Sequence, residues 1–160
     1  MRRRRMRVLG GAACLAALAA VAVVALPTAS GTAPAGSSFF AVLDGEHEQP
    51  DADGDGYGTF SASFRGNVLC YGIQVVNIAP PNAAHIHQGA VNVNGPIRVG
   101  LTPPTTGVQG ASAKCQTVPM AQANAIKANP GAFYVNVHNG AFPGGAIRGQ
   151  LFKATLAQDK

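Results

Sequence analysis

The chain of 160 residues has the length of one domain, and its 20 glycines and 11 prolines indicate many turns. Twelve basic residues against seven acidic ones give a formal charge of +5, but five of the basic residues lie within the first seven positions. The chain from residue 36 onward is near neutral, which excludes the basic stripe of a nucleic-acid-binding protein.

The amino-terminal segment has the order of a secretory signal peptide. Residues 2–7 are almost all arginine, residues 8–26 are apolar, and Pro27 interrupts any helix. Ala33 and Ala35 then supply the small residues of a cleavage site. The sequence therefore predicts cleavage after Ala35, and the alternative is an uncleaved membrane anchor.

This segment sets the expected compartment and the domain boundaries. A cleaved signal predicts a secreted, extracytoplasmic protein that meets the membrane only through the signal segment during export. The expected parts are a signal peptide and cleavage region (1–35), a short spacer (36–38), a folded domain (39–153) and a carboxyl-terminal tail (154–160).

From residue 39 onward the sequence predicts short strands separated by turns. Residues 57–65 and 68–78 flank Gly66-Asn67, a sequence typical of a hairpin turn. Residues 119–128 are the one predicted helix, with a proline at the start and Asn129-Pro130 as the stop. The other expected strands are 39–43, 83–89, 97–101, 132–138 and 146–152.

Seven or so short strands with frequent turns favour a mainly β fold. The predicted architecture is an antiparallel β-sandwich or Greek-key barrel, immunoglobulin-like or similar to Cu/Zn superoxide dismutase, with one short helix. About 120 ordered residues are enough to bury one core.

Acidic residues in the loop before the second strand resemble part of a calcium site. Asp51, Asp53 and Asp55 copy the first half of an EF-hand loop, but its twelfth position is Ala62, where the motif has a bidentate glutamate. The segment is predicted to be a flexible acidic turn, and weak calcium binding by the three aspartates is the alternative.

The expected compartment determines the oxidation state that we expect for the cysteines. Cys14 lies in the signal segment and is expected to be removed with it. Cys70 and Cys115 then remain in an oxidising environment, where two thiols usually form one disulfide. The sequence predicts that bond, and the alternative is two separate buried thiols.

Three histidines form the group of residues best suited to bind a metal ion. Residues two apart on a strand share a face, so His85 and His87 project to one side of their strand. His138 shares a side with the polar residues two and four before it. If the two strands are adjacent, three imidazoles gather on one surface and form a hypothetical copper or zinc site. The alternative is that His85 and His87 form hydrogen bonds with loops and that His138 caps the neighbouring strand.

Six short motifs follow one another along the chain. They are Leu43-Asp44-Gly45 with Glu48, Ala83–Gly89, Asn94-Gly95-Pro96, Asn129-Pro130, Tyr134–His138 and Pro143–Leu151. In this order they resemble the chordin-type (CHRD) domain family, and in particular its single-domain secreted bacterial members. The resemblance implies a β-rich fold, a recurring cysteine pair at Cys70 and Cys115, and no settled biochemical activity. Glu48 and Arg148 each lie in one of these motifs and are expected to form a structural ion pair.

These observations leave three functions open. The first is a non-catalytic extracellular module that binds an unknown ligand or protein, or serves a structural role. The second is a copper- or zinc-binding protein that uses His85, His87 and His138. The third is an enzyme similar to Cu/Zn superoxide dismutase. That enzyme uses further histidine ligands and an aspartate, whereas the chain after the signal segment has only His47 to add to the three histidines.

Overall fold

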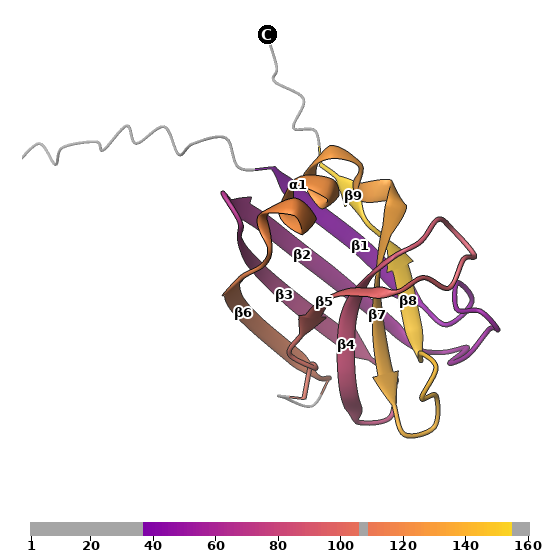
Figure 1. Ribbon diagram of the computed structural model, residues 1–160. Helices are drawn as coiled ribbons and strands as arrows, with labels where there is room; N and C mark the ends of the chain where they lie inside the picture. The colour runs from indigo at the N-terminus through magenta and orange to yellow at the C-terminus, as the bar shows by residue number, and fades with distance from the viewer. Residues whose placement is uncertain (1–36, 106–108, 155–160) are drawn as a thin grey trace, which may run out of the picture. The chain divides into compact units, whose positions relative to one another are not determined.

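The computed structural model describes residues 37–105 and 109–154, and the expected signal segment lies outside these ranges. Figure 1 shows the strands and helices. In chain order they are β1 (Ser38–Asp44), β2 (Tyr57–Arg65), β3 (Val68–Val76), β4 (Pro81–Gln88), β5 (Ile97–Leu101), β6 (Ala111–Thr117), α1 (Met120–Ala128), the 3-10 helix η1 (Pro130–Ala132), β7 (Phe133–Asn139), β8 (Ile147–Gln150) and β9 (Phe152–Lys153).

The strands form one curled antiparallel sheet. Its order is β5-β4-β7-β8-β1-β2-β3-β6, and β9 pairs with β1. The predicted mainly β, antiparallel architecture with one short helix is confirmed. Within the described ranges no helix has the length and apolar character needed to cross a membrane.

Alternate residues of the strands point into a common apolar interior. In β2 the buried residues Phe60, Ala62 and Phe64 alternate with exposed neighbours, as expected for a strand with one face on a core. In β4 Ala84 and Ile86 are buried on the same principle. His85 and His87, which alternate with these two residues, therefore point to the opposite side of the sheet.

Helix α1 covers one end of this interior (Figure 1). Ala123 and Ile126 are buried at helical spacing. Met120, the first residue of the helix, is 51% exposed.

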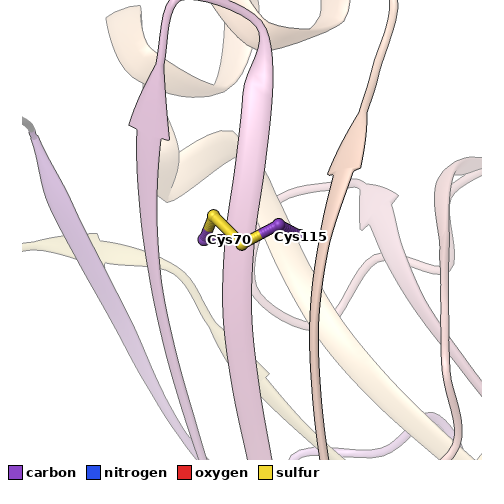
Figure 2. Close-up of a disulfide and its surroundings, with 2 residues drawn as sticks. All are labelled: Cys70 and Cys115. Atoms are coloured by element: carbon purple, nitrogen blue, oxygen red, sulfur yellow. A yellow bond between two sulfur atoms is a disulfide. The ribbon is translucent and has the colours of Figure 1, made fainter.

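Strand β6 is an element that the sequence did not predict. Its residues Ala-Ser-Ala-Lys-Cys-Gln-Thr lack the apolar alternation of the other strands, and none of their side chains is fully buried. The strand is held by antiparallel pairing with β3 and by the disulfide between Cys70 and Cys115, whose Cα atoms are 3.9 Å apart. Figure 2 shows this bond between the two strands, so the predicted disulfide is confirmed.

The two edges of the sheet, β5 and β6, are joined by side chains. Gln116 donates through Nε2 to the Gly100 carbonyl at 2.7 Å, and Ser112 donates through Oγ to the Thr102 carbonyl at 2.8 Å. The Thr102 backbone N–H donates to the Tyr71 hydroxyl at 2.7 Å. These bonds satisfy backbone groups that an open edge would leave unpaired.

The last predicted strand, 146–152, is divided in two. Its first part is β8, which pairs with β7, and its second part is β9, which pairs with β1. Leu151 turns into the core between them, and its N–H donates to the Phe133 carbonyl at 2.9 Å.

Candidate metal centre

Strands β4 and β7 are neighbours and bring three histidines together. The antiparallel register places His138 opposite Ala83, and His85 opposite Asn136. His85, His87 and His138, here called the histidine cluster, project from the face of the sheet opposite the core, the outer face. Their ring centroids are 5.0 Å (His85–His138), 5.5 Å (His85–His87) and 6.3 Å (His87–His138) apart. The expected adjacency of the two histidine-bearing strands is therefore observed.

The nitrogen atoms of the histidine cluster lie close together, and one pair of them has a spacing that suits shared coordination. One nitrogen from each ring lies within 4.8 Å of the others. His85 Nδ1 and His138 Nε2 are 3.1 Å apart. With metal–nitrogen bonds of roughly 2.0–2.1 Å, that separation gives an angle of about 100° at the metal, near the tetrahedral value.

Backbone carbonyls determine which nitrogens of two rings are free. His87 Nδ1 lies 2.9 Å from the Gly95 carbonyl oxygen, and His138 Nδ1 lies 3.0 Å from that of Pro143. A carbonyl oxygen only accepts, so each Nδ1 carries the hydrogen and each Nε2 keeps its lone pair. His87 Nε2 is buried and has no hydrogen-bond partner among the residues that the structure describes. Metal-ligating histidines commonly donate their second ring N–H to a carbonyl in this way.

His85 completes the cluster through its contact with His138. Because His138 Nε2 carries a lone pair, His85 Nδ1 donates to it in the metal-free protein. A metal ion between these nitrogens would replace that hydrogen bond, and the His85 hydrogen would then reside on Nε2.

Burial keeps the histidine cluster neutral. It lowers the pKa of all three rings below the ordinary value of 6.5. The positive charges of protonated His138 and His87 would lower the pKa of His85 further. For His87 and His138 the carbonyls that they bind oppose this shift without reversing it. At pH 7 the rings are therefore mostly in the neutral form that binds metal.

Two loops supply the carbonyls that orient the rings. In the loop after β4, the Gly95 N–H donates to the Tyr134 hydroxyl at 3.1 Å, while its carbonyl accepts from His87. A Cβ at Gly95 would overlap the Gln88 carbonyl, so only glycine fits this close approach. After β7, the buried Asn139 side chain accepts from the backbone N–H groups of Ala141 and Phe142 and shapes the turn that leads to Pro143.

Tyr134 lies between the cluster and a buried cation. Its ring is stacked on His87 with centroids 4.9 Å apart and an interplanar angle of 10°. The Arg148 guanidinium carbon lies 4.7 Å from the centroid of the same ring, a cation–π contact. Arg148 also lowers the pKa of His87, a lesser cause than burial.

Arg148 belongs to a buried polar network that continues along the outer face. Glu48 and Arg148 are each 3% exposed, and Arg148 Nε lies 3.9 Å from Glu48 Oε2. Glu48 accepts a hydrogen bond from the Asn136 amide. Arg148 donates through Nε to the His47 carbonyl and through Nη1 to Asn94 Oδ1 at 2.8 Å. The expected ion pair is present, although its two charged groups are too far apart for a hydrogen bond.

The pKa of the Glu48 carboxyl is raised well above its ordinary value. Burial raises the pKa of its carboxyl to about 7, although Arg148 and the Gln49 backbone N–H both lower it. Gly145 lies directly against this carboxyl at a φ of 145°, where a side chain would be strained and would overlap Glu48 and Asn136. Burial therefore favours the protonated form of Glu48 far more than that of an exposed carboxyl.

The comparisons with known proteins concern this same stretch of chain. A family model described as CHRD domain matches residues 39–151. The chain belongs to the CHRD domain family. Its matched region contains the histidine cluster, Glu48, Arg148 and the disulfide. No curated protein and no solved structure matches the chain.

The other predicted site residues of the CHRD domain lie apart from the cluster. The carboxylates of Asp51, Asp53 and Asp55 are not grouped as a metal site, and in the described ranges the histidine cluster is the one group of metal-ligating side chains. Burial and the neighbouring Asp55 raise the pKa of Asp53. His47 is exposed and bound to Asp44, with Nδ1 and Oδ1 2.5 Å apart.

Several residues that complete the site of the CHRD domain lie in the family motifs but were given no role at the site from the sequence. Tyr134 and Asn136 share the outer face with His138, and the alternation of their strand was the signal available for them. Asn94, Gly95 and Pro143 lie in loops, where no periodicity indicates which way a carbonyl or amide points.

Proposed function

We propose that this CHRD domain is a transition-metal-binding module that holds one copper or zinc ion with His85, His87 and His138. The observation that carries the proposal is the convergence of three neutral ring nitrogens within 4.8 Å of one another. Imidazole nitrogen is a ligand that both metals accept. Three protein ligands leave a fourth position for water or another small ligand.

The surroundings of the cluster support a ligand role over a purely structural one. A histidine that only binds a loop needs one hydrogen bond, and His87 and His138 each make that bond with Nδ1. Within residues 37–105 and 109–154, His87 Nε2 is nevertheless buried without a partner. Leaving such an atom unpaired costs about 1–3 kcal/mol. A metal ion would satisfy it.

The proposed place of action is outside the cytoplasm, as a secreted protein. The disulfide between Cys70 and Cys115 supports this, because such bonds persist in oxidising compartments. The signal-like residues 1–35 point in the same direction.

The proposal is tested by metal analysis of protein purified without an affinity tag. Wild-type protein should retain about one equivalent of copper or zinc after loading and desalting, because three imidazoles hold the ion. His87→Ala should lose it. The matched control is His47→Ala, which removes an exposed histidine outside the cluster and should retain the metal.

Two results would contradict the proposal. One is wild-type protein that retains no metal and melts at the same temperature with and without zinc. The other is equal metal retention by His87→Ala and wild type. In either case the first hypothesis from the sequence, an extracellular module with a different ligand, would take its place.

A further inference from the structure

We infer that the histidine cluster prefers monovalent copper over divalent copper, and that Arg148 is the charge that sets this preference. This inference rests on the proposed metal-binding function and adds the charge state of the metal.

The donor set carries no negative charge. Its three ligands are imidazoles, and in the described ranges no carboxylate or thiolate joins them within the coordination spacing. A bound ion therefore keeps its full charge in a partly buried position. The free-energy cost of burying an ion rises steeply with the magnitude of its charge. A neutral donor set therefore disfavours a divalent ion more than a monovalent one.

A buried positive charge also lies close to the cluster. Arg148 is 3% exposed and contacts the Tyr134 ring on which His87 is stacked. In the part of the chain that the structure describes, its hydrogen-bond acceptors are the neutral oxygens of His47 and Asn94, and Nη2 is buried without a partner. Its one ion-pair partner in the described ranges is Glu48, at 3.9 Å and without a hydrogen bond. The guanidinium charge is thus only partly neutralised.

The two carboxylates near Arg148, those of Asp44 and Glu48, offset its charge only in part. Asp44 is its cross-strand neighbour, but the Asp44 carboxylate accepts from the backbone N–H of His47 and contacts its ring. Glu48 gives its other oxygen to Asn136. Neither carboxylate makes a hydrogen bond with the guanidinium in the described part of the chain.

The expected size of the effect follows from Coulomb's law. Arg148 and His87 contact the same ring, so the guanidinium lies within roughly one Debye length of the cluster. At an effective dielectric constant of about 20, a unit charge at that range weakens the binding of each added positive charge by about tenfold. Copper(II) carries one charge more than copper(I), so the ratio of their affinities changes by that factor.

The test compares the affinities of untagged protein for copper(I) and copper(II), each by competition with a chromophoric chelator at pH 8. Arg148→Met should lower the ratio of copper(I) to copper(II) affinity about tenfold, which lowers the reduction potential by about 59 mV. Glu48→Gln should raise the ratio, because it removes a negative charge beside Arg148 and keeps a side chain of the same shape.

The opposite signs of the two variants separate an electrostatic effect from general damage. A ratio that is the same as in wild type, or one that moves in the same direction in both variants, overturns the inference. If Arg148→Met does not fold, the direction of the shift in Glu48→Gln decides. Wild-type protein that binds neither copper nor zinc overturns the proposed function itself. Binding of zinc without copper, or tight copper binding with an unchanged ratio in both variants, overturns only this inference.

Discussion

At the scale of single residues, the outer face holds side chains whose burial works against their charge. Glu48 and Arg148 are as buried as the apolar core, yet their charged atoms are 3.9 Å apart. Burial therefore outweighs the ion pair and raises the pKa of Glu48 to about 7. A carboxyl with this property makes folding stability depend on pH.

The pH dependence has a definite sign. Since the Glu48 pKa is higher in the folded protein than the ordinary value of 4.5, its contribution to stability is fully present below pH 4.5 and is lost as pH rises through about 7. Glu48→Gln has no such loss. Relative to the variant, wild type should therefore lose on the order of 3 kcal/mol of unfolding free energy across this window.

Urea unfolding of both proteins at a series of pH values from 4 to 8 measures the difference. The histidine cluster contributes a slope of the opposite sign, because its lowered pKa values give stability that is lost as pH falls below the ordinary value of 6.5. Both proteins share that slope, so it cancels. Parallel stability curves would show that Glu48 titrates normally.

At the scale of elements, the strands divide into those that carry their own signal and those that depend on partners. β2 and β5 were predicted with the bounds that the structure shows, because their apolar and polar residues alternate. β6 has no such pattern and is a strand because β3 and a covalent bond hold it. Propensity cannot reveal an element of this kind.

The candidate site likewise has a part that the sequence pattern predicts and a part that depends on tertiary contacts. The common face of His85, His87 and His138 was predicted from a period of two and from the assumption that their strands are neighbours. The hydrogen bonds that set the tautomers depend on loop backbone at Gly95 and Pro143. They arise from tertiary contacts between segments far apart in sequence, which local patterns do not encode.

Removing the disulfide should release β6 and leave the histidine cluster intact. In the double variant Cys70→Ser, Cys115→Ser, the 45-residue separation between the cysteines predicts a loss of about 4 kcal/mol of unfolding free energy. Hydrogen exchange should accelerate in β6 first, because it is an edge strand with little buried surface. Metal retention should stay at the wild-type level, because β4 and β7 lie elsewhere in the sheet order. Unchanged exchange in β6 would mean that pairing with β3 alone holds the strand.

At the scale of the whole molecule, the sheet has two faces with different roles. The inner face is apolar and is covered at one end by α1. The outer face carries the histidine cluster and the buried polar network, which is bonded to the loop between β1 and β2 and to the loop between β4 and β5. These loops are joined to each other, since Asn94 donates through Nδ2 to the Gln49 carbonyl at 2.8 Å. Ligand binding on the outer face is therefore linked to the stability of the fold as a unit.

Metal addition should raise the melting temperature of the folded chain. At a free metal concentration of one hundred times Kd, binding to the folded state alone adds about 2.7 kcal/mol. The gain should disappear as pH falls through the lowered pKa values of the cluster, because protons then compete for the ring nitrogens. Calorimetry with zinc, with a chelator and with His87→Ala measures it. An equal rise in melting temperature for His87→Ala would place the stabilising ion elsewhere.

The carbonyls that fix the proton positions of His87 and His138 belong to the main chain. Every amino acid offers the same oxygen there, so tautomer choice does not depend on which side chains surround these carbonyls. Over evolutionary time the rims of this sheet face are therefore free to diversify, provided that the path of the polypeptide and the close approach at Gly95 are kept.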